Sequence, residues 1–202
     1  WTNAFNTVMV SGLAALAAAV AALPIAVLAI RYPGRIVSAL ERLSYVGFAL
    51  PGLAIALAFV FLASSLLTPL YQTIFLLVTA YVVLYLPASV GATESSLKQI
   101  SPRVEEAARG LGKTSFEAFR LVTLPLLTRG IAAGAALVFL LTMKELPATL
   151  VLSPSGFQTL ATSVWGAASE AFFARAAVPA LLLVLAAGFP MAYLVLREDR
   201  GR

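Results

Sequence analysis

Four long stretches of the chain contain no Lys, Arg, Asp or Glu: Val8–Ile30, Tyr45–Leu67, Leu70–Thr93 and Ala177–Leu196. A helix needs about 20 apolar residues to cross the hydrocarbon core of a bilayer. A fifth run, Gly130–Leu152, is equally apolar apart from the adjacent pair Lys144 and Glu145. With 61% hydrophobic and 11% charged residues, the chain has more apolar surface than a soluble domain covers. The sequence therefore predicts an all-α integral membrane protein with five spans.

The chain contains neither cysteine nor histidine. Disulfide scaffolds, zinc sites built from Cys and His, and catalysis by either residue are therefore excluded. We expect no catalytic residues, no metal site and no cofactor bound by this chain, which argues against an enzyme.

Basic residues predict the orientation in the membrane. Of the 14 Lys and Arg residues, 12 fall in residues 31–42, 98–129 and 197–202, which five spans place on one side. By the positive-inside rule this side is cytoplasmic, so the C-terminus is expected inside and the N-terminus outside. Because topology accounts for the net charge of +5, no nucleic-acid partner is expected. The uncharged start at Trp1–Asn6 leads us to expect that further spans precede it, as in half of a longer or duplicated protein.

The segment Glu94–Arg129 is the one long stretch with the composition of a soluble protein. Ser101–Pro102 is typical of a helix start, and Gly112 suits the left-handed residue that closes a helix. Thr114–Glu117 fits a capping box, so a second helix starts there, and we expect Leu124–Pro125 to end it. The pattern predicts two short helices bent at a glycine on the cytoplasmic face.

Residues 107–114 also satisfy a loosened phosphate-binding loop pattern, with alanine in place of the first glycine. A true phosphate-binding loop follows a buried strand and opens a helix. Here the preceding residues are predicted to be helical, and the sequence offers Asp199 as its sole aspartate for magnesium. The alternative from another class, a membrane NTPase in which Lys113 binds phosphate, therefore lacks its structural context.

The same segment resembles the cytoplasmic motif of inner-membrane permeases of binding-protein-dependent ABC importers. That motif reads E-A-A, three residues, G, nine residues, I-x-L-P; the chain has Glu106-Ala107-Ala108, Gly112 and Val122-Thr123-Leu124-Pro125 at the matching spacing. The departure is Val122 in place of isoleucine. Three predicted spans before the loop and two after it extend the resemblance over residues 1–202, as one permease domain.

This resemblance implies a MetI-like bundle in a bacterial inner membrane, with residues 94–129 as a coupling loop that docks on a separate cytoplasmic ATPase dimer. ATP and magnesium would be used there. The resemblance also implies three further partners: a second permease half, a periplasmic binding protein and the lipid of the membrane. The candidate coupling residues are Glu105, Glu106, Ala107, Ala108, Gly112, Phe116, Val122, Leu124 and Pro125. We expect the two glutamates to pair with basic groups of the partner; a solvated loop without a partner is the alternative.

Lys144 and Glu145 lie within an otherwise apolar run, where charges are costly and usually face a bundle interior or an aqueous cavity. One interpretation places both on the translocation path, where the carboxylate meets a cation. The other is an ion pair that only fixes helix packing. The surrounding sequence Met143–Thr149 is similar to the ferric-iron branch of these permeases, which implies ferric iron as cargo; thiamine, polyamine and phosphonate remain alternatives.

Apolar residues recur at helical spacing along Phe157–Phe172, with Gln158, Ser169 and Glu170 among the polar positions of the opposite face. The pattern predicts an amphipathic helix on the outer face, with Trp165 near the lipid headgroups. Such a helix either caps the bundle or serves as a gate or a contact for the binding protein.

Overall fold

The structure, a computed structural model, describes residues 1–199, and side chains are described for residues 1–188. Every regular element in this part of the chain is helical, which confirms the all-α prediction. The long helices are α1 (Thr2–Arg31), α5 (Ile74–Lys98), α8 (Leu124–Met143) and α11 (Phe173–Asp199). The shorter elements are α2 (Arg35–Ser44), α3 (Val46–Ala49), α4 (Gly52–Ser65), η1 (Thr68–Leu70), α6 (Pro102–Gly110), α7 (Ser115–Ala118), η2 (Phe119–Thr123), α9 (Pro147–Leu152) and α10 (Leu160–Ser169).

Within the described part of the chain, three helices are long and apolar enough to cross a membrane: α1, α5 and the continuous helix Ser115–Met143. The predicted span Ala177–Leu196 lies within α11, whereas the predicted span Tyr45–Leu67 is wrong as a single helix. It divides into α3 and the 14-residue α4, with Leu50 in an extended conformation (ψ 144°) between them. Pro51 explains the break, because proline disfavours helical geometry in the residue before it.

The fourth predicted span is also placed differently. Its helix ends at Met143, so Lys144 and Glu145 lie in the break before α9 and not inside a helix. At the other end, Pro125 does not end the second short helix, which passes through the five-residue π-helix η2 into α8. Pro125 is the second residue of α8 and directly follows η2, whose π-helical turn changes the hydrogen-bond register before the proline. The loop therefore continues directly into a membrane helix.

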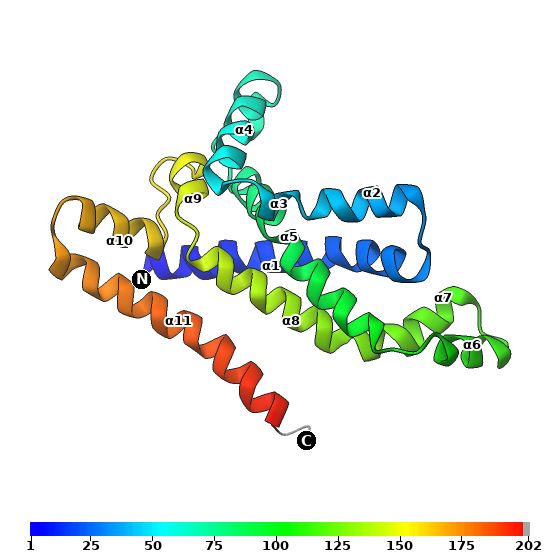
Figure 1. Cartoon of the computed structure of the whole chain (residues 1–202). Helices are drawn as coiled ribbons and strands as arrows, with labels where there is room; N and C mark the ends of the chain where they lie inside the picture. Colours follow the sequence, from blue (N-terminus) through cyan, green and yellow to red (C-terminus); the bar gives the residue numbers. More distant parts are fainter. Residues whose placement is uncertain (200–202) are drawn as a thin grey trace.

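Helices α1, α5 and α8 pack along one another and form the centre of the molecule (Figure 1). Small residues allow this approach: Ala14, Ala18 and Ala80 are completely buried in the core. Glycines of α8 continue the pattern, since a Cβ at Gly134 would lie 3.0 Å from the Cα of Ser89 on α5. Small residues at such contacts are typical of helix packing in membranes.

Replacing Gly134 with alanine is expected to destabilise the protein by about 1–3 kcal/mol, because α5 and α8 must separate to admit the added methyl group. Denaturant-induced unfolding in detergent micelles measures the loss. Gly12→Ala is the matched control, since nothing lies within 4 Å of the added Cβ on α1. Equal stability of the two variants would contradict the prediction.

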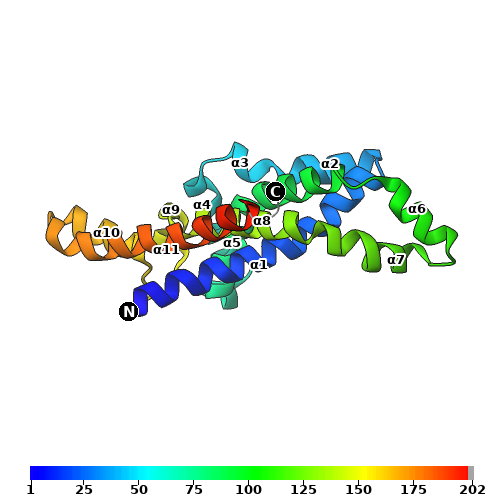
Figure 2. The ribbon, with the colours of Figure 1, turned by 90° about the horizontal axis from the view of Figure 1, so that it is seen from below.

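The two ends of the molecule carry different elements. Figures 1 and 2 show α6, α7 and the C-terminal end of α1 at one end, with α10 and the N-terminus at the other. The predicted amphipathic helix is shorter than Phe157–Phe172: Thr159 caps α10 at its start, and the left-handed Ala171 (φ 61°) lies just beyond its end. Trp165 is half exposed, and the Thr7 hydroxyl of α1 accepts a hydrogen bond from the Leu160 N–H at 2.8 Å.

Candidate functional site

Local hydrogen bonds build the coupling loop as its sequence predicts. The Ser101 side chain caps α6 by accepting from the Arg103 N–H at 3.4 Å. Gly112 adopts φ 84°, the left-handed conformation that glycine takes without steric cost. Thr114 and Glu117 then form a reciprocal capping box, with the Thr114 N–H donating to the Glu117 carboxylate at 2.8 Å. The helix, glycine bend and second helix start are therefore confirmed.

The candidate coupling residues divide into two groups by exposure. Glu106, Ala107, Gly112, Phe116 and Pro125 are exposed; Glu105, Ala108, Val122 and Leu124 are partly buried. Exposed apolar residues that the motif does not include also lie on the two loop helices or between them, among them Leu111 (85% exposed) and Val104 (41% exposed). The signal for them was present in the sequence, since both are large aliphatic residues within a polar segment.

Glu105 has partners within the chain. Its Oε1 lies 3.2 Å from Nη2 of Arg31, the last residue of α1, and accepts a hydrogen bond from the Thr123 hydroxyl at 2.8 Å. Arg31 Nη2 also donates to the Ile100 carbonyl at 3.0 Å. Of the two glutamates expected to face a partner, Glu106 is thus free to do so, whereas Glu105 is engaged internally. No local pattern in the sequence links Arg31 to Glu105.

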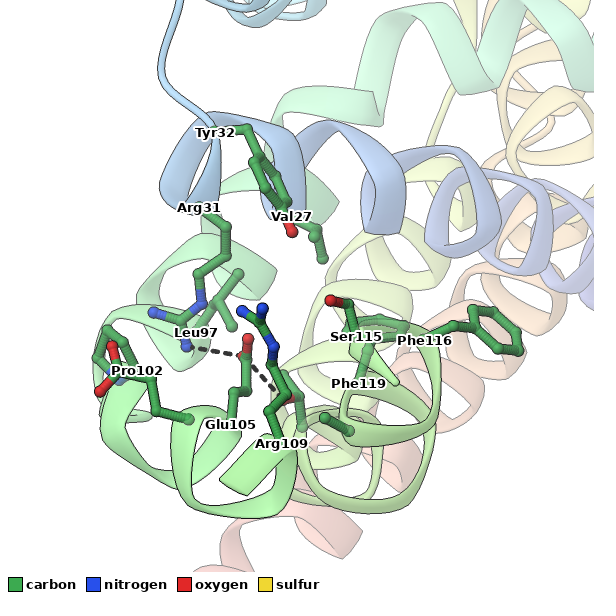
Figure 3. A pocket seen from close by; sticks show the side chains of 13 residues that line it. Val27, Arg31, Tyr32, Leu97, Pro102, Glu105, Arg109, Ser115, Phe116 and Phe119 are labelled. Atoms are coloured by element: carbon green, nitrogen blue, oxygen red, sulfur yellow. Dashed lines mark hydrogen bonds and ion pairs between the residues drawn. The ribbon is translucent and has the colours of Figure 1, made fainter. Parts of the chain in front are cut away.

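These groups border a cavity of about 390 Å³ between the end of α1 and the two loop helices. Figure 3 shows Arg31, Glu105 and Arg109 pointing into it, with Tyr32 and Phe119 on its walls. The lining thus combines two guanidinium groups, carboxylates and aromatic rings from segments far apart in the sequence.

The nucleotide-binding alternative finds no support in this geometry. Residues 107–110 form the last turn of α6, and the residues before them are helical, where a phosphate-binding loop would follow a strand. Lys113 lies in the exposed turn between α6 and α7. Residues 1–199 contain no β-strand that such a loop could follow.

Glu145 ties the break between α8 and α9 to α5. Its Oε2 accepts a hydrogen bond from the Tyr85 hydroxyl, and its Oε1 accepts from the Ala148 N–H at 3.1 Å, in the first turn of α9. One helical turn from Tyr85, the Tyr81 hydroxyl shares a 2.5 Å hydrogen bond with Thr149. Sequence reasoning missed both tyrosines, because nothing local relates them to Glu145.

Lys144 is exposed, whereas Glu145 is only partly exposed. No ion pair joins the two within residues 1–188, where the two ion pairs found are Arg31–Glu105 and Glu94–Lys98. The ion pair that the packing interpretation expects is therefore not found among the described side chains. Glu145 is held instead by hydrogen bonds from a hydroxyl and a backbone N–H. Their place on a translocation path stays a prediction. Within the described side chains, no three of His, Cys, Asp and Glu gather to hold a metal ion.

The chain is similar in sequence to curated permease proteins and similar in fold to solved ABC transporter structures. The chain is 42% identical over 186 residues to the Fe(3+)-transport system permease protein FbpB 2 of Haemophilus influenzae, covering 92% of this chain and 37% of that protein. It is 28% identical to the putative 2-aminoethylphosphonate permease PhnV of Salmonella typhimurium, covering 72% of this chain and 55% of that one. The same identity relates it to the putrescine permease PotI of Escherichia coli K12, covering 75% and 55%. The chain thus spans between about a third and about half of the length of these relatives.

Two solved structures share the arrangement of helices. The inward-facing methionine ABC transporter MetNI matches with a TM-score of 0.77 at 18% identity, over 98% of this chain and 94% of that one. An amino acid ABC transporter solved with histidines matches with a TM-score of 0.72 at 20% identity, over 98% and 92%. Residues 14–197 match the family described as the binding-protein-dependent transport system inner membrane component. The chain therefore belongs to this family of ABC transporter permeases, and its fold is the MetI-like fold.

Proposed function

We propose that this chain forms one side of the substrate path of an ABC importer and that a separate ATPase dimer drives it. Family membership and the apolar helices support the role of a membrane permease. ATP binding and hydrolysis take place in the partner, and closure of the ATPase dimer moves the coupling loop. The helices then change from an outward-facing to an inward-facing arrangement, a change between two states and not a reaction on the substrate.

The exposed surface of the loop supports docking on such a partner. Phe116 is 71% exposed and Leu111 is 85% exposed, and the Glu106 carboxylate lies on the same loop. Leu111 directly follows α6 and Phe116 lies on α7, and exposed apolar side chains on short helical segments, with a charge on the same loop, suit docking in a groove of a partner. The small side chain of Ala107 leaves room for the wall of a groove.

The distribution of basic residues supports a cytoplasmic position for the loop. The segments 31–42 and 98–129 carry nine of the 14 basic residues. Figure 1 shows the end of α1 and helices α6 and α7 at one end of the molecule. The three C-terminal arginines belong to the same predicted side, but their side chains lie outside the described residues. By the positive-inside rule we place this end in the cytoplasm.

Ferric iron, delivered by a periplasmic binding protein, is the proposed cargo. The single observation that carries this proposal is the 42% identity to a ferric-iron permease over 92% of the chain, against 28% for the phosphonate and putrescine relatives. A second permease half is required to enclose the path, and it belongs either to the same polypeptide or to another subunit.

Uptake by the assembled transporter tests the proposal. The full-length permease, its ATPase and its binding protein are reconstituted in liposomes, and accumulation of ferric iron, putrescine, 2-aminoethylphosphonate and thiamine is measured with and without ATP. ATP-dependent accumulation of iron alone is expected. Accumulation of another of these substrates without iron would overturn the proposal that ferric iron is the cargo. ATP hydrolysis by the permease without its ATPase would overturn the proposal that a separate subunit hydrolyses ATP.

A further inference from the structure

The side chain of Arg31 joins the end of α1 to the coupling loop. Arg31 Nη2 contacts the Glu105 carboxylate at 3.2 Å and the Ile100 carbonyl at 3.0 Å. Its side chain is 12% exposed and that of Glu105 is 26% exposed, so the ion pair is largely withdrawn from water. Glu105 in turn accepts from Thr123, on the segment that leaves the loop. The Arg31 guanidinium thus connects α1 to Ile100, which precedes α6, and to Glu105 on α6. Through Glu105 it is also connected to Thr123, which precedes α8.

This connection matters because α1 is not continuous with the loop. The loop follows α5 in the chain and leads into α8, so its motion reaches these two helices through the backbone. Helix α1 packs along both of them and occupies the centre of the bundle. Arg31 gives α1 a direct mechanical link to α6, in addition to its contacts along α5 and α8.

The ion pair is costly to break from one side. Removing either partner leaves a charge that is largely buried, which is more destabilising than the absence of both. Arg31 is also well placed at the C-terminal end of α1, where the helix dipole favours positive charge. The other charged residues that line the cavity are Glu106 and Arg109, and neither forms an ion pair among the described side chains. The link therefore rests on Glu105.

We propose that Arg31 and Glu105 are positioning residues that make α1 move together with the coupling loop, so that motion of the loop enters the membrane through three helices instead of two. The proposal rests on the coupling function proposed above. It assigns to Glu105 a role within the chain and leaves Glu106 as the carboxylate that faces the ATPase.

The first test compares transport with ATP hydrolysis in the reconstituted transporter. Arg31→Gln and Glu105→Gln are expected to retain ATPase binding and hydrolysis while the iron transported per ATP falls on the order of tenfold. Arg103→Gln, at an exposed position of α6, is the matched control and is expected to keep the normal ratio. Normal ratios in both Arg31→Gln and Glu105→Gln would overturn the proposal.

A charge exchange separates positioning from a general loss of stability. The double variant Arg31→Glu with Glu105→Arg restores an ion pair of reversed polarity, although not the hydrogen bond from Arg31 to the Ile100 carbonyl, and is expected to recover part of the ratio lost in each single variant. A double variant no better than either single variant would overturn the proposal. Failure of the coupling function itself is recognised differently: Glu106→Gln and Phe116→Ala would then bind the ATPase as tightly as the unmodified permease.

A distance measurement does not depend on the cargo. The chain itself has no cysteine, so once cysteines elsewhere in the assembled transporter are replaced, spin labels attach specifically to Tyr32→Cys, directly after α1, and Arg103→Cys on α6. In the assembled transporter the distance between the labels is expected to stay constant when ATP binds. In the same transporter carrying Glu105→Gln, ATP binding is expected to change this distance. A distance that changes equally with and without Glu105→Gln would show that α1 and α6 move independently, against the proposal.

Discussion

Replacing Gly112 with valine is expected to impair substrate uptake strongly while the permease still inserts into the membrane. Gly112 has φ 84°, and a non-glycine residue pays about 1–2 kcal/mol for this left-handed conformation, with β-branched residues at the upper end. The cost is conformational, because a Cβ there would meet nothing within 4 Å. The turn then prefers another geometry, which redirects α6 relative to α7. We expect uptake to fall at least about tenfold, measured with the amount of ATPase that copurifies.

Two further variants control this experiment. Gly110 lies in the last turn of α6, with a helical φ and open space around a Cβ, so Gly110→Ala is expected to keep uptake within about twofold. Asparagine adopts the left-handed conformation more readily than valine, so uptake by Gly112→Asn is expected to lie between that of Gly110→Ala and that of Gly112→Val. Normal uptake by Gly112→Val would show that the bend does not need the left-handed residue.

Signals that act within one or two turns of the chain are sufficient to predict the coupling loop. Ser101, Gly112 and the Thr114–Glu117 box each satisfy hydrogen bonds among their immediate neighbours, and the structure contains all three. Long hydrophobic runs are equally sufficient to predict α1 and α5, because a segment that crosses the bilayer must satisfy its backbone hydrogen bonds internally, as a helix does. The all-α class and the bent loop thus follow from local chemistry.

Proline is a poorer guide, because its effect depends on packing. Pro24 and Pro87 lie inside α1 and α5 without ending them, whereas Pro51 separates α3 from α4. Pro125 is accommodated because the π-helix before it shifts the hydrogen-bond register. Neighbouring helices support the continuous cases, and the sequence around each proline does not report which neighbours it will have.

Contacts between distant segments cannot be predicted from local patterns at all. In the sequence Arg31 is one of many basic residues that indicate topology, and Glu105 is expected to face a partner, although the fold brings the two together. Tyr81 and Tyr85 belong to a predicted apolar span, although their hydroxyls hold the α8–α9 break. Each of these pairs depends on how α1, α5 and α8 pack, which single-chain periodicity does not specify.

Removing the Glu145 side-chain oxygens is expected to destabilise the break between α8 and α9. In Glu145→Leu the Tyr85 hydroxyl and the Ala148 N–H lose their acceptor, at about 1–3 kcal/mol for each unsatisfied group. We expect a total loss of about 2–6 kcal/mol, measured by unfolding in detergent micelles. Lys144→Gln is the control: this side chain is exposed, and its loss is expected to change stability by less than about 0.5 kcal/mol. Equal stability of both variants would contradict the role of Glu145 in holding α9 to α5.

Glu145→Gln separates that role from a place on the substrate path, because it removes the charge and can keep both contacts: its amide oxygen accepts from the Ala148 N–H, and its NH2 group donates to the Tyr85 hydroxyl. We expect this variant to be nearly as stable as the unmodified protein. If the carboxylate also meets a cationic cargo in transit, iron uptake falls about tenfold or more although the fold is intact, since a lost charge contact costs more than a lost neutral one. Unchanged uptake of iron, putrescine and thiamine would assign Glu145 to the packing of α9 alone. The path would then need no fixed charge, and selection of the cargo would rest with the binding protein.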